Sequence, residues 1–364
     1  MRIHLPALPG QPVTKANSTC AFTNKVVRFP EMMEGIEVIV YGDPRHDDLP
    51  NYVACYDEQE PPEFTEGGWA ESNKLATAEI RERAEPGDLL ALPGGLCQAE
   101  LVRELPELTA FELGIGYPGS MHSVHRVFES YAWMNMTYGK EADGGIGNVN
   151  PSFYDAVIPG YFDPSEFPDD RDDMGYLLYV GRLIDRKGVA IAVDVARELG
   201  LPILLAGSGD CRPDYDMAEY IGPVLPEERN DLMAGATALL APTTYAEPFG
   251  NIVPEAHLNG CPTVTTDFGA FPETNVHGLT GFRARTFGEF CDAVERCSEL
   301  DSGQIRAHAI ANHSYNAIRP RYTAYFEQLQ TLTGKGWYEK WSGLEHSRYG
   351  PRPASAKIAA TLDT

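Results

Sequence analysis

The sequence predicts an α/β protein with two domains, each built on a parallel β-sheet. Candidate strands alternate with candidate helices through both halves of the chain, which is typical of parallel sheets with right-handed crossovers. The chain has 364 residues, enough for two domains with separate cores. A stretch rich in proline and aspartate, at residues 156–173, divides the halves. We therefore expect a first domain at 1–160, a linker at 161–174 and a second domain at 175–312.

The first domain begins with an expected strand at residues 1–8, followed by a polar loop. Apolar residues then recur at the spacing of a buried helix face, at Phe22, Val26, Phe29 and Met33. The expected order continues with a strand at 36–41, an exposed acidic loop at 42–68, a helix around 70–85, a strand at 88–92, a helix around 97–105 and a strand at 108–113. Residues 114–139 come next, and their glycines predict a loop at the carboxyl end of that strand.

The second domain begins with an expected strand at residues 175–181. Two further buried strands are predicted at 237–241 and 262–266 by short apolar runs. Apolar and aromatic residues at helical spacing predict C-terminal helices at 313–342 that return toward the first domain. The tail at 343–364 is polar, and we expect it to be loosely ordered.

The composition disfavours several classes of protein. The net charge of −24, from 53 acidic and 29 basic residues, opposes binding to nucleic acid or to an anionic membrane. No stretch has the length and apolarity of a signal peptide or of a membrane span. The seven cysteines show no paired spacing, which indicates a reducing compartment. We therefore expect a cytoplasmic protein.

The stretch at 245–260, YAEPFGNIVPEAHLNG, places Glu247 and Glu255 eight residues apart. A turn between them leads into a short helix after a buried strand, at the edge where open α/β sheets bind ligands. Free N–H groups at the helix start would suit an anion, and the residues concerned are Phe249, Gly250, Asn251 and Ile252. Two carboxylates beside an anion site suit a ligand with both hydroxyl and phosphate groups, which predicts a nucleotide sugar.

This stretch resembles the paired-glutamate signature of the family-4 retaining glycosyltransferases, which have the GT-B fold. The resemblance continues through the motifs YVGRLIDRKG (179–188), AGSGD (206–210), YIGPVLPEERNDLMAGATALLAP (220–242), GCPTVTTDFGAFPE (260–273) and HGLTGF (277–282). In the first half, GIGY, RVFES, YAW and TK…CAFTNKV resemble a subgroup found in bacteria and their phages. The resemblance implies two Rossmann-like domains facing a cleft, and the host cytoplasm as the location if a phage encodes the chain.

The resemblance assigns the chemistry of the donor to the second domain. Arg182 and Lys187, which follow Gly181, would bind the donor diphosphate. Arginine offers a planar fork to phosphate oxygens and lysine a point charge. By resemblance, Glu247 holds the hydroxyls of the donor sugar and Glu255 binds the ribose, since a carboxylate accepts from two hydroxyl groups.

Further donor contacts are expected at the ends of neighbouring strands. Gly207 and Gly209 follow an apolar run and would let a nucleotide approach the sheet closely. Ile221, Gly222 and Val224 lie where the family holds the nucleotide base. The end of a core strand explains these three residues equally well, so both interpretations stay open.

The remaining candidates lie at the expected carboxyl edge of the first sheet, and they are Thr14, Lys15, Gly116, Tyr117, His122 and Arg126. Thr14 and Lys15 replace the glycine-rich loop that the family usually has after its first strand. His122 is a candidate for contact with the acceptor hydroxyl or the donor phosphate, although a polar side chain that simply lies on the protein surface explains it equally well. Arg126 lies in the matched motif RVFES and has either an acceptor-binding or a structural role.

The resemblance implies a hexosyltransferase that moves a sugar from a nucleoside-diphosphate donor to an acceptor hydroxyl with retention, without metal or cofactor. Two other classes stay open: a GT-B nucleotide-sugar epimerase, and a noncatalytic protein that binds nucleotide sugars and tolerates the loss of Glu247. Residues 40–70 carry eight acidic side chains against Arg45 alone, which favours a protein or small glycan acceptor over DNA. The donor base, the donor sugar and the oligomeric state stay open.

Overall fold

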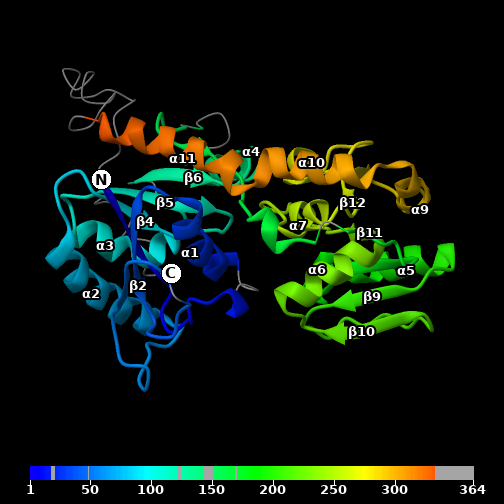
Figure 1. The fold of residues 1–364 in the computed structure, drawn as a ribbon, viewed down its shortest axis with the longest axis horizontal. Helices are drawn as coiled ribbons and strands as arrows, with labels where there is room; N and C mark the ends of the chain where they lie inside the picture. Colours follow the sequence, from blue (N-terminus) through cyan, green and yellow to red (C-terminus); the bar gives the residue numbers. More distant parts are fainter. Residues whose placement is uncertain are drawn as a thin grey trace. The chain divides into compact units, whose positions relative to one another are not determined.

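The computed structural model describes residues 1–17, 21–47, 49–121, 124–142, 149, 151–168 and 170–332. The chain divides into two compact units (Figure 1). The N-terminal unit holds Met1–Phe128, Asn135–Ile158 and the described residues from Arg319 on, and the C-terminal unit holds Glu129–Met134 and Pro159–Ile318. Two helices, α4 (Tyr131–Glu141) and α11 (Tyr315–Gln330), therefore contain residues of both units.

The sheet of the N-terminal unit has the strand order β3-β2-β1-β4-β5-β6-β7, and all neighbouring strands are parallel. Its strands are β1 (Arg2–Pro6), β2 (Glu37–Gly42), β3 (Tyr52–Ala54), β4 (Leu89–Leu92), β5 (Thr109–Ile115), β6 (His125–Phe128) and β7 (Ala156–Val157). The first strand lies inside the sheet and the chain winds outward from it in both directions, as in a doubly wound fold.

Helices cover both faces of this sheet, and those of the N-terminal unit alone are α1 (Ala21–Met32), α2 (Glu66–Arg83) and α3 (Ala99–Glu104). On one face, Ile80 of α2 packs in a cluster with Leu90 of β4. On the other, the ring of Phe326 in α11 lies 6.3 Å from that of Phe29 in α1 and 5.1 Å from that of Phe111 in β5. The second half of α11 thus completes the core of the N-terminal unit.

The sheet of the C-terminal unit has the order β10-β9-β8-β11-β12-β13, again with parallel neighbours. Its strands are β8 (Tyr176–Val180), β9 (Ile203–Ala206), β10 (Ala218–Gly222), β11 (Ala236–Ala241), β12 (Thr263–Thr266) and β13 (Gly281–Ala284). Its helices are α5 (Val189–Leu199), α6 (Pro226–Gly235), α7 (Ile252–Leu258), α8 (Phe271–Thr274), α9 (Phe287–Arg296) and α10 (Ser302–His313).

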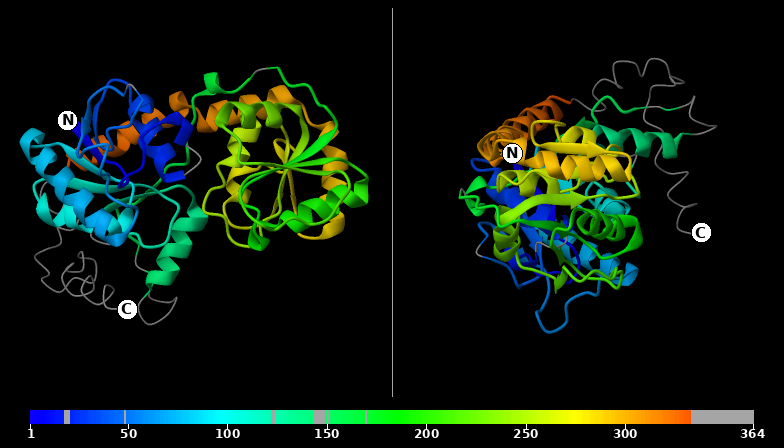
Figure 2. Two further views of the ribbon diagram at one scale, coloured as in Figure 1. Left: turned by 90° about the horizontal axis from the view of Figure 1, so that it is seen from below. Right: turned by 90° about the vertical axis from the view of Figure 1, so that its right-hand side faces the viewer.

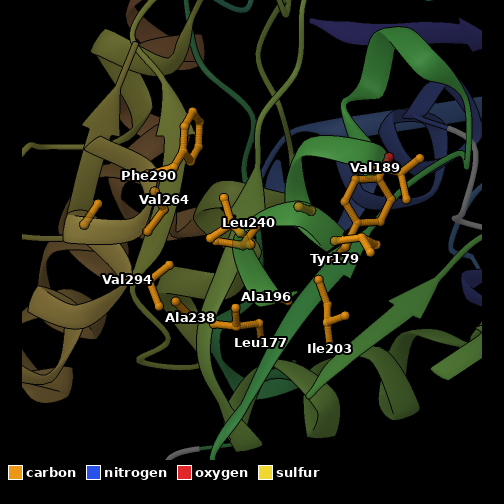
Figure 3. Close-up of a cluster of buried hydrophobic side chains, with 14 of the residues drawn as sticks. Leu177, Tyr179, Val189, Ala196, Ile203, Ala238, Leu240, Val264, Phe290 and Val294 are labelled. Atoms are coloured by element: carbon orange, nitrogen blue, oxygen red, sulfur yellow. The ribbon is translucent and has the colours of Figure 1, made fainter. Parts of the chain in front are cut away.

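Side chains of β8 fill both layers of the C-terminal unit. Leu177 and Tyr179 lie in the cluster shown in Figure 3, together with residues of α5 and α9. Leu178 lies in a separate cluster with Val253 of α7. Successive side chains of a strand point to opposite faces, so the strand needs apolar residues at every position. Figure 2 shows the helices on both faces of this sheet.

The predicted α/β class with two parallel sheets is confirmed, while one local expectation is wrong and another is incomplete. The acidic stretch at 42–68 is not a single loop, because it contains the edge strand β3 and the start of α2. At that start, Thr65 caps the helix by accepting a hydrogen bond from Gly68 N at 3.3 Å. Residues 114–139 contain β6 and most of α4 as well as the expected loop. Neither short strand has an apolar period that would reveal it.

Candidate functional site

Three glycines form the carboxyl edge of the neighbouring strands β8, β9 and β10. Gly181, Gly207 and Gly222 have φ angles of 155°, 144° and 80°. The N–H of Gly207 donates to the Gly222 carbonyl at 2.8 Å, which joins two of these strand ends. A Cβ on Gly207 would lie 1.8 Å from the carbonyl oxygen of Gly181, so a larger residue does not fit. The edge therefore presents backbone without side chains, which lets a ligand approach closely.

The residues around this edge are packed just as closely. Gly209 has a φ of 133°, and a Cβ there would lie 2.4 Å from the carbonyl oxygen of Leu183. Ile221 is half-buried in β10, and Val224 is buried two residues beyond its end. Two aliphatic side chains thus flank Gly222, where the sequence leaves a base-binding and a core role open.

The loops after β8 and β11 are joined through their backbones. A single 3-10 turn, η5 (Asp185–Lys187), follows β8, and Thr244 donates its N–H to the carbonyl of Arg186 at 2.9 Å. Gly188 closes the turn with a φ of 75°, and a Cβ there would lie 1.9 Å from the carbonyl oxygen of Pro242. The two loops are therefore fixed against each other, which holds their side chains at set positions.

Lys187, Tyr245 and Glu247 form a polar cluster on these loops. The Nζ of Lys187 lies 2.8 Å from Oε2 of Glu247, and the hydroxyl of Tyr245 donates to the same oxygen at 2.6 Å. The side chains of Lys187 and Glu247 are 20% and 12% exposed. Burial, followed by the charge of Glu247, raises the pKa of Tyr245, so its hydroxyl keeps the proton. No described residue bonds Oε1 of Glu247, which leaves that oxygen available to a ligand.

Two exposed arginines add positive charge to the same loop. The guanidinium of Arg186 lies over the ring of Tyr245, 5.1 Å from its centroid, and Nζ of Lys187 lies 5.2 Å from it. Arg182 accepts a hydrogen bond from Tyr179 through its carbonyl, at 2.8 Å, while its side chain is bonded to no described residue. An exposed guanidinium that follows a side-chain-free edge suits a phosphate group.

The turn before α7 keeps several backbone donors unused. Gly250 has a φ of 81°, and a Cβ there would lie 2.9 Å from the ring of Phe271 and 3.2 Å from Cγ of Glu247. The neighbouring Phe249 is buried and anchors the turn. Within the described ranges, no acceptor is bonded to the N–H groups of Phe249, Gly250, Asn251 and Ile252. These groups include the first amides of the helix, which have no partner inside it.

Glu255, on α7, is 3% exposed and forms a buried ion pair. Its Oε2 lies 3.3 Å from Nε of Arg229 on α6, and Nη2 of Arg229 donates to Oε1 at 3.3 Å. A ribose at this position would share the carboxylate oxygens with Arg229. The sequence does not indicate this pair, because only the packing of α6 against α7 brings the two side chains together.

The candidates after β1 lie in the N-terminal unit. Thr14 is half-buried, and its Oγ1 accepts a hydrogen bond from Asn17 N at 3.2 Å. Lys15 is exposed, with its Nζ 3.2 Å from Oε1 of Glu31. His122 lies outside the described residues.

The loop after β5 is held by a buried carboxyl group. Gly116 is half-buried, while Tyr117 is buried and donates its hydroxyl to Glu112 at 2.8 Å. The N–H of Met121 donates to the other oxygen of Glu112. Burial raises the pKa of Glu112 to about 8. The sequence gives no sign of this anchor, because Glu112 stands inside an otherwise apolar strand.

Arg126, on β6, is 3% exposed and forms two ion pairs. Its guanidinium contacts Asp155 at 2.7 Å and Glu141 at 3.0 Å, and Tyr138 also donates to Asp155, at 2.7 Å. These contacts favour the structural role that the sequence left open for Arg126. His125 is the first residue of β6.

The second half of the chain is similar in sequence to known glycosyltransferases. A family profile described as "Glycosyl transferases group 1" matches residues 175–299. Over 175 residues, the chain is 34% identical to a glycogen synthase of Mycobacterium tuberculosis, covering 43% of this chain and 40% of that protein. Over 179 residues, it is 29% identical to the D-inositol 3-phosphate glycosyltransferase of Rhodococcus erythropolis, covering 40% of each. The chain thus matches two fifths of the length of these relatives.

Solved structures match almost the whole chain. AviGT4, a glycosyltransferase involved in avilamycin A biosynthesis, superposes with a TM-score of 0.68 at 18% identity, over 92% of this chain and 99% of that one. Anabaena Alr3699/HepE in complex with UDP gives a TM-score of 0.61 at 16% identity, over 91% and 100%. These likenesses confirm the predicted GT-B fold.

Two further observations concern the described part of the chain. It contains no group of three or more His, Cys, Asp or Glu side chains arranged to hold a metal ion. None of its helices has both the length and the apolarity needed to cross a membrane. Residues 175–299, in the C-terminal unit, are thus similar to a glycosyl transferases group 1 domain, and the chain shares the GT-B fold.

Proposed function

We propose that this protein is a retaining hexosyltransferase that moves a sugar from a nucleoside-diphosphate donor to an acceptor hydroxyl. The observation that carries this proposal is the carboxyl edge of the C-terminal sheet, where bare backbone at Gly181 and Gly207 is followed by Arg182 and the Lys187–Glu247 pair. Close backbone approach and fixed cations suit a diphosphate, and a free carboxylate oxygen suits sugar hydroxyls. The similarity to enzymes named as glycosyltransferases, and to a structure solved with UDP, supports the same assignment.

In the proposed reaction, the bond between C1 of the donor sugar and the diphosphate oxygen breaks, and the acceptor oxygen bonds C1 on the same face. The proton of the acceptor hydroxyl passes to the leaving diphosphate. Arg182 and Lys187 stabilise the negative charge that develops on this group. The ammonium of Lys187 has three N–H donors, of which one is bonded to Glu247. Cations held in place before the reaction need little reorganisation, so no metal takes part in this proposal.

We place the other parts of the donor along the same edge. The base lies beside Ile221, Gly222 and Val224, and the nucleotide crosses the backbone of Gly207 and Gly209. The ribose hydroxyls share Glu255 with Arg229. The unused amides at the start of α7, from Phe249 to Ile252, face the anionic part of the donor.

For the acceptor, we propose a protein or a small glycan that binds to the N-terminal unit. The loop with Gly116 and Tyr117, and the residues Thr14 and Lys15, are the proposed contacts. The acidic stretch at 40–70 and the net charge of −24 oppose the approach of duplex DNA. We also propose a cytoplasmic location, which the free thiols of the six described cysteines support.

The test is turnover of a panel of nucleotide sugars with glycan, peptide and duplex-DNA acceptors, followed by mass spectrometry and by NMR of the new anomeric centre. We expect release of nucleoside diphosphate together with a product of unchanged anomeric configuration. A chelator should leave turnover within about twofold, because fixed cations stabilise the leaving group. An epimerised donor without transfer would instead identify an epimerase, and nucleotide binding without any turnover a noncatalytic protein.

A further inference from the structure

Tyr245 has no role in the proposed reaction as described above, although its side chain contacts Glu247. Its hydroxyl donates to Oε2 of Glu247 at 2.6 Å, and Lys187 occupies the same oxygen at 2.8 Å. Two donors on one oxygen restrict rotation of the carboxylate. They also leave Oε1 as the oxygen of Glu247 without a described partner.

The two donors differ in what else they can bind. Lys187 has a flexible stem and, in the proposed reaction, also binds the leaving diphosphate. The phenol of Tyr245 has a single proton, and that proton is bonded to Glu247. When the diphosphate attracts Lys187, Tyr245 is therefore the donor that still holds the carboxylate in place.

The ring of Tyr245 is itself held by charge. The cations of Arg186 and Lys187 lie 5.1 Å and 5.2 Å from its centroid. The backbone bond from Thr244 N to the carbonyl of Arg186, at 2.9 Å, fixes the loop that carries the ring. Because burial and the charge of Glu247 raise the pKa of Tyr245, the phenol stays a hydrogen-bond donor at neutral and mildly alkaline pH.

We propose that Tyr245 is a positioning residue for the sugar transfer, and this inference rests on the proposed function. Its hydroxyl holds the Glu247 carboxylate so that Oε1 is presented to the hydroxyls of the donor sugar. Tyr245 touches neither donor nor acceptor in this role. It acts on turnover through Glu247 and leaves the binding of the diphosphate to Arg182 and Lys187.

The test compares Tyr245→Phe, which removes only the hydroxyl, with the unmodified protein. We expect kcat to fall roughly 10-fold, the effect of losing a hydrogen bond to a charged group. Calorimetry should show the Kd of free nucleoside diphosphate unchanged within about twofold, since the ring and both cations remain. The matched control is Tyr176→Phe, because Tyr176 donates its hydroxyl to Leu232 O at 2.8 Å at the start of β8, away from the strand's carboxyl end. It should keep the kcat of the unmodified protein.

A double-mutant cycle separates positioning from a general effect on folding. If Tyr245 acts through Glu247, adding Tyr245→Phe to Glu247→Ala, which removes the acceptor of the Tyr245 hydroxyl, should reduce kcat by less than about twofold further. The ratio of kcat between the unmodified protein and Tyr245→Phe should also stay constant from pH 6 to about pH 9, because the phenol keeps its proton.

Unchanged kcat in Tyr245→Phe, or a full 10-fold loss on the Glu247→Ala background, would overturn the inference. Equal weakening of kcat and of nucleoside-diphosphate affinity would overturn it as well, because the phenol would then serve diphosphate binding. If the unmodified protein binds nucleotide sugars but turns none over, the proposed function fails together with this inference. Loss of kcat in Tyr245→Phe alone, with the control active, supports both.

Discussion

The two sheets use their polar residues in opposite ways. In the C-terminal unit, Gly181 and Gly207 keep the strand ends bare, and the charged groups beside them are wholly or partly exposed. In the N-terminal unit, Glu112 and Arg126 stand inside the sheet and are almost fully buried. The same doubly wound topology therefore carries an open edge in one unit and an internal polar network in the other.

This difference separates groups that can bind a ligand from groups that hold the fold. A buried charge needs partners within the protein, as Arg126 has in Asp155 and Glu141. The side chain of Arg182 has no bonded partner among the described residues and keeps its hydrogen-bond donors for an anion. Burial and pairing thus assign Arg126 to stability and leave Arg182 for the proposed function.

Replacing each of the two arginines by methionine should show the largest difference in stability between the two sites. Arg126→Met leaves the buried carboxylate of Asp155 and the half-buried one of Glu141 without their cation, and we expect unfolding free energy to fall by about 3 to 5 kcal/mol. Arg182→Met is a surface change and should alter stability by less than about 0.5 kcal/mol. Urea unfolding of the two variants measures both effects. Equal stability of the two variants would contradict the assignment.

A smaller effect on stability is expected at Gly207, at the carboxyl edge of the C-terminal sheet. Gly207→Ala should destabilise the C-terminal unit by about 3 kcal/mol, because its Cβ would lie 1.8 Å from a carbonyl oxygen at a φ of 144°. The matched control is Gly200→Ala, where φ is 64° and no atom lies within 4 Å of the new Cβ. Strain alone should cost about 1 kcal/mol there. Thermal unfolding of both variants checks the difference, and similar melting temperatures would show that the edge accepts a side chain.

A pH-dependent effect on stability is expected in the polar network of the N-terminal unit. The pKa of Glu112 is raised from 4.5 to about 8 in the folded chain, where Tyr117, Arg126 and Asp155 surround it. Between these values the folded state binds the extra proton, so this group's contribution to stability falls as pH rises, by at most about 1.4 kcal/mol per pH unit. Glu112→Gln removes that loss. The variant should therefore gain stability relative to the unmodified protein between pH 5 and pH 8, and a constant difference in melting temperature would contradict this.

The sequence predicts the open edge better than the buried network, for a physical reason. Glycines that need a positive φ, and cations beside them, are visible as a local pattern, so Gly207 and Arg182 could be named in advance. The bonds of Tyr245 to Glu247 and of Arg229 to Glu255 depend on how separate loops and helices pack. Glu112 could not be recognised, because a single carboxylate within a strand has no periodic signature. The short strands β3 and β6 also lack an apolar period, so the sequence does not reveal them.

The central claim is that the C-terminal edge binds the diphosphate of a nucleotide. Isothermal titration calorimetry with a panel of nucleoside diphosphates tests it directly, using the unmodified protein, Lys187→Met and, as control, Lys74→Met on the exposed surface of α2. We predict binding of at least one nucleoside diphosphate, a loss of roughly 10- to 100-fold in affinity for Lys187→Met, and no change for the control. Absence of binding by every nucleotide, or equal affinities in all three proteins, would contradict the account.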